Sequence, residues 1–155
     1  MELEHAKELA LELMKQHGLK FWYFEFDNSK RRFGICRHYR RTIGLSRNLV
    51  LLNTKESVKD TILHEIAHAL AGPNNGHNWI WRQIALEIGC NGKRCYSKED
   101  TILVEGTLLA KCPNCGKEYG RFRKPRKKYS CGVCSNGIYN EKFLLVFERK
   151  NTNSE

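Results

Sequence analysis

The chain has 155 residues, which is the size of one ordinary domain or of a compact domain with a small appendage. Hydrophobic residues make up 41% and charged residues 28%, which excludes a disordered or fibrous protein. The net charge of +10 is unevenly placed, because residues 1–106 carry 16 Lys and Arg against 13 Asp and Glu, whereas residues 107–150 carry 11 against 3.

The first third of the sequence predicts one helix followed by short strands. Apolar residues recur at helical spacing over residues 3–17, and Gly18 is a natural C-terminal stop. Residues 21–27, 32–38 and 41–46 are aromatic or β-branched runs separated by polar turns, a pattern typical of two or three short antiparallel strands. Together these elements indicate an α+β fold.

Two further helices are expected before residue 90. Asn53 is placed to cap the start of a helix, with the Glu56 side chain directed back to the Asn53 backbone N–H as in a capping box. Apolar residues then recur on one face of this helix until Gly72. A third helix is predicted from about residue 78 to residue 88, closed by Gly89. A change in composition over residues 98–106 then divides the chain into predicted domains 1–100 and 101–150.

The second helix contains His64-Glu65-Ile66-Ala67-His68, the H-E-x-x-H motif. Four residues make about one helical turn, so both imidazoles project from one face and can bind one metal ion, with Glu65 close by. Zinc in such a site activates water, and Glu65 could take the water's proton. The alternative is a helix whose histidines face solvent or satisfy hydrogen bonds in the core.

Two residues compete for the place of third metal ligand. His77 follows His68 after eight residues, across a Gly-Pro-Asn-Asn-Gly turn, and Glu87 follows it after eighteen. Spacing eliminates neither, although the tight turn favours His77. The metzincin arrangement is excluded, because Ala71 and Asn74 stand where it needs Gly and His.

The C-terminal part carries two C-x-x-C pairs separated by 15 residues, formed by Cys112, Cys115, Cys131 and Cys134. This spacing predicts a closed four-thiolate zinc site, a zinc ribbon whose strands we expect at 107–110 and 143–147. Metal binding should supply much of the folding free energy of so short a segment. The alternative is a redox pair of dithiols. Cys36, Cys90 and Cys95 fit neither site and are interpreted as buried or free thiols.

A basic segment lies between the two cysteine pairs. Six of its nine residues are Lys or Arg, and two aromatic residues are interleaved. Phosphate contacts and base stacking would make it a nucleic-acid-binding loop. Its alternatives are a solvated loop and a nuclear-targeting signal. The candidate contacts are Arg121, Phe122, Arg123, Lys124, Arg126, Lys127, Lys128 and Tyr129.

The sequence from Asp60 through the H-E-x-x-H motif to His77 and Trp81, followed by Ile88-Gly89-Cys90, resembles the SprT-like family, which includes the Spartan proteases that degrade proteins crosslinked to DNA. The resemblance implies a zincin-like metallopeptidase core followed by a zinc ribbon. It implies one catalytic zinc on His64, His68 and His77, Glu65 as catalytic residue, and one structural zinc on the four cysteines. One departure is Asn78, where the family commonly has Gly; we expect Asn to tolerate a left-handed backbone there.

The resemblance also implies a protein substrate, DNA as a partner, and a role in the repair of DNA–protein crosslinks. No segment reads as a signal peptide or a membrane span, so we expect a cytoplasmic, DNA-associated protein with no membrane partner, in the host cytoplasm if it is viral. The long tail of animal Spartan proteins is absent, which favours a bacterial or viral type.

Two other functions stay open at the level of sequence. One is a non-catalytic zinc protein that binds nucleic acid and regulates transcription, against which the intact Glu65 argues. The other is an aminopeptidase on free peptides with Glu87 as a ligand, which would leave the basic segment without a role.

Overall fold

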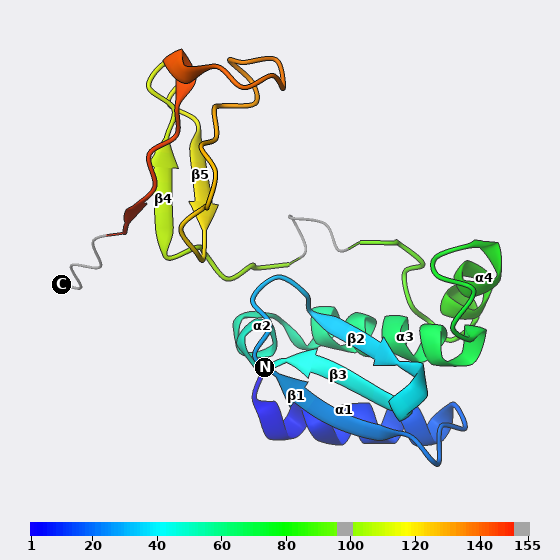
Figure 1. Ribbon diagram of the computed structural model, residues 1–155. Coiled ribbons are helices and arrows are strands. Elements are labelled where there is room, and N and C mark those ends of the chain that lie inside the picture. Colours follow the sequence, from blue (N-terminus) through cyan, green and yellow to red (C-terminus); the bar gives the residue numbers. More distant parts are fainter. Residues whose placement is uncertain (96–100, 151–155) are drawn as a thin grey trace. The chain divides into compact units, whose positions relative to one another are not determined.

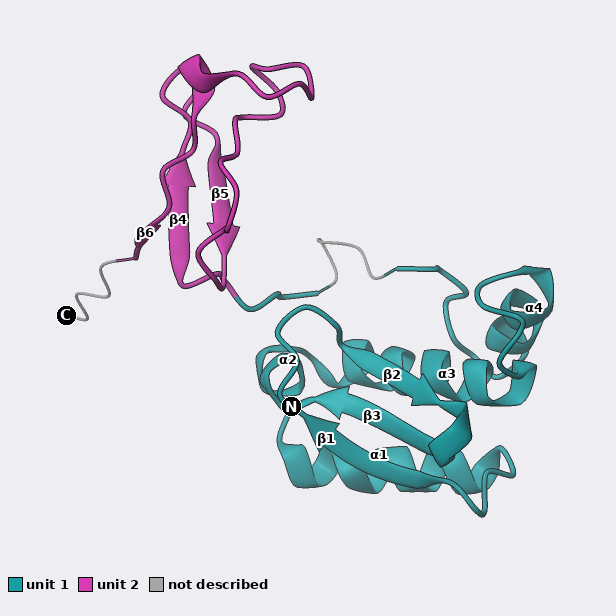
Figure 2. Ribbon diagram, viewed as in Figure 1, with its two compact units in different colours: residues 1–104 teal, residues 105–155 magenta. Residues whose placement is uncertain are grey.

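The computed structural model describes residues 1–95 and 101–150. The chain forms two compact units, residues 1–104 and residues 105–155 (Figure 2), each with its own core. The domain boundary predicted between residues 100 and 101 adjoins residues 96–100, which lie outside the described part. No described helix is long and apolar enough to cross a membrane.

Unit 1 begins with helix α1 (Leu3–Gln16) and a three-stranded sheet. The strands are β1 (Tyr23–Asp27), β2 (Gly34–Arg37) and β3 (Thr42–Ser46), with a short 3-10 helix, η1 (His38–Arg40), between β2 and β3. Gly18, at φ +79°, ends α1 in the left-handed backbone that glycine adopts without strain. The helix and strands match the predicted α+β class.

The prediction of a purely antiparallel sheet is wrong. The strand order is β1-β3-β2, with β2 antiparallel to β3 but β1 parallel to β3. Successive strands alternate in direction as expected, yet β3 takes the central place. Its five residues are all buried, including Ile43 and Leu45, so burial selects it as the middle strand.

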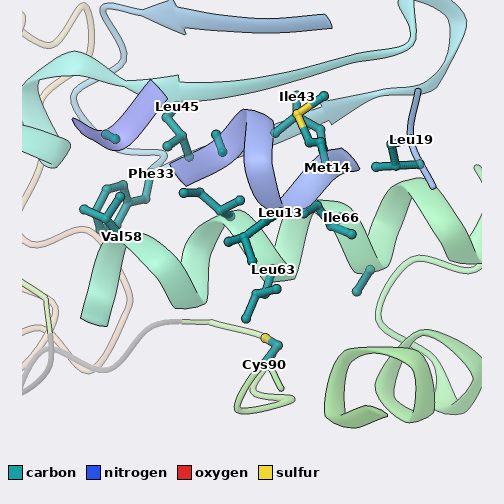
Figure 3. Close-up of a cluster of buried hydrophobic side chains, with 14 of the residues drawn as sticks. Leu13, Met14, Leu19, Phe33, Ile43, Leu45, Val58, Leu63, Ile66 and Cys90 are labelled. Atoms are coloured by element: carbon teal, nitrogen blue, oxygen red, sulfur yellow. The ribbon is translucent and has the colours of Figure 1, made fainter. Parts of the chain in front are cut away.

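Helices α1 and α3 (Lys55–Ala71) pack against each other and against one face of the sheet (Figure 1), and the core fills the space between them (Figure 3). A short helix that the sequence did not indicate, α2 (Arg47–Leu52), connects β3 to α3. Ser46 caps it by accepting the Leu49 backbone N–H. The labelled core side chains of Figure 3 are Leu13, Met14, Leu19, Phe33, Ile43, Leu45, Val58, Leu63, Ile66 and Cys90.

The predicted cap of α3 is wrong by one residue. Thr54 is the N-cap, and its side chain accepts the Ser57 backbone N–H. Asn53 is instead buried, where its side chain exchanges two hydrogen bonds with the backbone of Ile102, at 2.9 and 2.7 Å. The Asn53 amide thus satisfies the backbone of a distant segment, and Thr54 supplies the cap in its place.

Helix α4 (Trp79–Glu87) follows α3 and packs against it. Asn78 is its N-cap, with φ −74° and a side chain that accepts the Trp81 backbone N–H. The left-handed backbone predicted for Asn78 is therefore wrong, because Asn stands here as one of the residues preferred at a helix start.

Unit 2 is a second three-stranded sheet of order β5-β4-β6, all antiparallel. Its elements are β4 (Leu108–Lys111), β5 (Glu118–Arg121), the 3-10 helix η2 (Glu141–Phe143) and β6 (Glu148–Arg149). The strand predicted at 143–147 is wrong: Leu144 forms an isolated antiparallel bridge with Ser130, and the run supplies Leu145 and Phe147 to the small core without joining the three-stranded sheet. The strand that pairs with β4 is β5, whose polar sequence gives no strand signal.

Candidate metal centres and catalytic cavity

Three histidines converge at the end of α3. His64 and His68 lie one turn apart on the helix, and His77 lies in the connection to α4. Gly72, at φ +86°, ends α3 and turns the chain back toward the helix. The three Nε2 atoms lie 3.3, 3.1 and 3.0 Å from one another, so the set can hold a single metal ion.

The geometry fits zinc. Tetrahedral zinc with nitrogens at about 2.0–2.1 Å places those nitrogens about 3.3 Å apart, close to the separations seen here. Burial is the main cause that lowers the pKa of His64 to about 4 and that of His68 to about 3. Both imidazoles are therefore neutral near pH 7, which is the form that binds a metal.

Trp81 supports all three histidine rings, a role that the sequence did not reveal beyond its match to the family pattern. Its ring centroid lies 4.7 Å from that of His64, 5.3 Å from that of His68 and 4.6 Å from that of His77. The Trp81 side chain is only 1% exposed, so the indole ring is held in place on α4 and packs against the three histidine rings. Packing of this kind fixes ring orientations before a metal binds.

Glu65 lies beneath β2, with 6% of its surface exposed. Burial raises the pKa of its carboxyl to about 8, against the opposing effects of the Arg32 guanidinium and of a hydrogen bond from the Cys36 backbone N–H. The positive charge of a bound metal would lower this pKa and favour the carboxylate.

Gly34 allows β2 to pass closely over Glu65. A Cβ atom built at Gly34 would lie 2.6 Å from Glu65 Oε1 and 2.7 Å from its Cγ, closer than real contacts allow. Strand and carboxylate can therefore occupy these positions together only while residue 34 has no side chain.

If the site hydrolyses peptide bonds, Gly34→Ala should lower the rate at least about tenfold by displacing the Glu65 carboxylate, without loss of zinc from the three histidines, because a misplacement near 1 Å at a reacting group can cost that much or more. Hydrolysis rate and zinc content of the purified variant check this. The control is Gly132→Ala, since an added Cβ there meets open space. An unchanged rate in Gly34→Ala would mean that the close approach of β2 at Gly34 is not what holds Glu65 in its working position.

A cavity of about 660 Å³ opens over these groups. Its walls come from β2 and the residues before it, from α3, and from residues 91–95. Asp60 fixes the last segment, because its carboxylate accepts the Asn91 backbone N–H at 2.8 Å and the Asn91 side chain at 2.7 Å. The three histidines and Glu65 thus face a cavity large enough for part of a peptide.

Glu87 does not join the histidine cluster. It is exposed in the last turn of α4, and the described metal-binding group consists of His64, His68 and His77. His77 itself precedes α4, so the connection between α3 and α4 places it in the cluster.

The two candidates for third ligand separate in a direct test. His77→Gln should lose zinc at the histidine site or weaken its binding by about tenfold or more, because only two of the three imidazole ligands remain. Glu87→Gln should leave the zinc affinity unchanged. Competition of each variant with a zinc chelator measures the affinity. The reverse pattern would make Glu87 the ligand.

The four cysteines form a second candidate metal site in unit 2. Their sulfur atoms lie within 4.8 Å of one another, with 3.8 Å between Cys112 and Cys134 and 3.7 Å between Cys115 and Cys131. Tetrahedral zinc–sulfur bonds of about 2.3 Å require sulfur separations of about 3.8 Å. Four thiolates leave no position for water, so this set suits a structural ion.

Neighbouring side chains form hydrogen bonds with two of the four cysteine sulfur atoms. Tyr119 Oη lies 3.1 Å from Cys131 Sγ, and the Asn114 side-chain amide donates to Cys134 Sγ at 3.4 Å. The Tyr119 contact is the main cause that lowers the pKa of Cys131, with further help from the Cys134 backbone N–H, whereas hydrogen bonds from the other three cysteines help to raise the pKa of Cys115. A cysteine with a lowered pKa is already partly in the thiolate form that binds zinc, so fewer protons must be released when the metal binds.

The remaining cysteines and histidines belong to neither group among the described residues. Cys36 lines the cavity beside the three histidines, and burial raises the pKa of its thiol to about 12. Cys90 is buried, with a pKa raised to about 11 by burial, and Cys95 is exposed at the cavity. His5, His17 and His38 lie outside both metal groups.

The predicted nucleic-acid contacts divide into two sets. Arg123, Lys124, Arg126 and Lys127 are exposed, and none has an ion pair within the described ranges. The other members contact their own unit: Lys128 pairs with Glu141 at 3.1 Å, Arg121 stacks 4.3 Å from the ring centroid of Tyr129, and Phe122 is half-buried. Four cations are thus presented to solvent on this loop.

Two histidines lie one turn apart on a helix beside a small sheet, and a third comes from the loop that follows this helix. This arrangement is that of a zinc metallopeptidase-like domain. The family model described as SprT-like matches residues 4–101, and the chain belongs to this family. No individual curated protein matches the chain. The family recognised from the motif is thereby confirmed.

Proposed function

We propose that the chain is a zinc-dependent endopeptidase. The observation that carries this proposal is the convergence of the three Nε2 atoms within 3.3 Å of one another beside the buried Glu65, in one cavity. A purely structural metal site would need the ligands but no carboxylate held next to them at the cost of burial.

His64, His68 and His77 would hold the ion. Zinc supplies an acidified water and polarises the scissile carbonyl. Glu65 lies outside the ligand set, so it takes the proton from water and later delivers it to the leaving amine. The Arg32 guanidinium favours the ionised carboxylate that the first of these steps requires.

Strand β2 offers a place for the substrate backbone. It is an edge strand, and it lies beside α3 (Figure 1), with the Cys36 backbone N–H directed at Glu65. An extended peptide can pair with such an edge without presenting a free terminus. This favours cleavage within a chain over the aminopeptidase alternative, whose ligand Glu87 is exposed outside the histidine cluster.

We further propose that unit 2 directs the peptidase to DNA-associated proteins, including proteins crosslinked to DNA. The support is the concentration of 11 Lys and Arg against 3 acidic residues in residues 107–150, with Arg123, Lys124, Arg126 and Lys127 exposed on one loop. Lys and Arg side chains bind phosphates with release of counterions. The alternative of a non-catalytic regulator would keep this binding and lack hydrolysis.

Replacing those four residues by Gln should weaken DNA binding and reduce the slope of log affinity against log salt by about 0.7 to 0.9 for each phosphate that the loop no longer neutralises. Cleavage of a protein crosslinked to single-stranded DNA should fall with it, while cleavage of a short free peptide should stay. Fluorescence anisotropy at several salt concentrations and the two cleavage rates measure this, with a chelator-treated sample as the blank.

The matched control replaces Lys7, Lys15, Lys55 and Lys59 by Gln, which removes the same charge from exposed helical positions of unit 1. Equal affinity and equal salt slope in wild type and loop variant would show that the loop is only a solvated face. Absence of hydrolysis on both substrates would instead remove the peptidase proposal.

A further inference from the structure

Unit 1 has an aromatic and basic surface of its own that neither metal site uses. We propose that this surface binds single-stranded nucleic acid beside the catalytic cavity, independently of the loop in unit 2. We call it the sheet-end patch. It consists of Lys20, Phe21, Tyr23, Tyr39, Arg40 and Arg41.

Two segments build the sheet-end patch, namely the turn before β1 together with the first residue of β1, and the connection between β2 and β3 (Figure 1). The Tyr23 backbone N–H donates to the Arg41 carbonyl at 2.7 Å, which ties the segments together. The rings of Trp22 and His38 meet edge to face with centroids 5.9 Å apart just inside them. The patch therefore has a fixed base from which its outer side chains project.

The aromatic side chains of the sheet-end patch are unusually exposed. Phe21 is 78% exposed, Tyr23 72% and Tyr39 103%. Three large aromatic rings in solvent, gathered on two adjoining segments, mark a binding surface more often than a stability feature. Neither segment contains an acidic residue over residues 17–23 or 38–42.

Basic residues surround these rings. Lys20, Arg40 and Arg41 are exposed, and the nearest acid along β1, Glu25, is already hydrogen-bonded to Arg37. Arg41 has φ +47°, a left-handed backbone in which glycine would be less strained. Arg41 thus places a positive charge at a position where the backbone conformation by itself would favour glycine.

Alternating rings and cations fit a single strand better than other partners. Unpaired bases expose faces that stack on aromatic side chains, whereas a duplex hides those faces, and the cations are left to contact phosphates. An apolar protein surface would match the rings but not the three positive charges.

The sheet-end patch adjoins the proposed reaction site. His38, which immediately precedes Tyr39, lines the catalytic cavity together with the metal ligands. A strand on the patch would therefore hold an attached protein next to the cavity. The binding itself does not require peptidase activity, so the two proposals fail separately.

The test compares full-length zinc-loaded variants by anisotropy with labelled oligo(dT) and with a duplex of equal length. Phe21→Ala with Tyr39→Ala should weaken oligo(dT) binding about fivefold or more for each ring and duplex binding little. Lys20→Gln with Arg40→Gln should reduce the salt slope for oligo(dT) by about 1.4. Lys55→Gln with Lys59→Gln is the charge-matched control, and both residues are exposed.

Photocrosslinking of wild type to oligo(dT) containing 5-iododeoxyuridine locates the contact. Crosslinked peptides from residues 20–23 or 38–41 are expected, in wild type and in the Gln variant of the unit 2 loop. Unchanged oligo(dT) affinity of the aromatic variant, with crosslinks confined to residues 107–150, would overturn the inference and leave the unit 2 proposal standing. Equal losses for oligo(dT) and duplex would also overturn it, because stacking on unpaired bases would not be the source.

Discussion

Glu65→Gln should abolish peptide hydrolysis, with a rate loss of about 10² to 10⁴, while zinc stays bound. General acid–base catalysis by one positioned group contributes about that factor. The amide matches the carboxylate in size, so it fits the space beneath Gly34, but it cannot accept a proton from water. Turnover of an unstructured peptide and zinc content of the same sample measure the two effects.

The matched control is Glu87→Gln, the same chemical change at an exposed position on the neighbouring helix. It should keep both the rate and the zinc. A Glu65→Gln protein that still turned over peptide would remove the proposed mechanism. Loss of zinc in that variant would instead make Glu65 a metal ligand, against the three-histidine cluster of the structure.

The histidine site can be anticipated from sequence because its chemistry follows from local geometry. His64 and His68 are four residues apart, and any helix brings them to one face. His77 is favoured because Gly72 and Pro73 force a turn, and after this turn the His77 Nε2 atom lies 3.0 Å from the Nε2 atom of His64. Helical spacing alone places His64 and His68 together, whereas for the third ligand the tight turn only favours His77 over Glu87.

The residues that hold the histidines and Glu65 in place cannot be anticipated from the sequence, because their roles depend on contacts between segments that lie far apart in the chain. Gly34 reads as an ordinary residue of a strand run, yet it is the residue that lets β2 pass over Glu65. Trp81 reads as one apolar position of a helix, yet its ring backs three histidines. Periodicity tells which face a side chain occupies but not what it meets there.

Errors in the strand predictions have the same origin. The apolar run at 143–147 has the composition of a strand, but in a small unit that run is needed to cover the cysteine site, where Leu145 and Phe147 pack with Cys112 and Cys131. The polar β5 is a strand because β4 requires a partner. Tertiary context overrides strand propensity most easily where the core is smallest.

Cys112→Ser should reduce the zinc content from two ions per chain to one and unfold unit 2 alone. Among the described residues, the core of that unit contains five buried side chains, two of them cysteines of the metal set, so apolar burial cannot replace the metal. Structural zinc contributes about 10–16 kcal/mol in comparable small sites, more than a unit of this size gains otherwise. Elemental analysis gives the ion count, and limited proteolysis locates the unfolded segment.

Cys95→Ser is the control for this change, because Cys95 is exposed and lies outside the four-cysteine group. It should keep two ions. In the Cys112→Ser protein, new proteolytic cuts are expected within residues 105–150, while residues 1–95 stay protected and peptide hydrolysis continues, since unit 1 has its own core and its own metal ligands. An unchanged ion count in Cys112→Ser would mean that the four cysteines do not hold zinc, and the spacing of their sulfur atoms would then need another explanation.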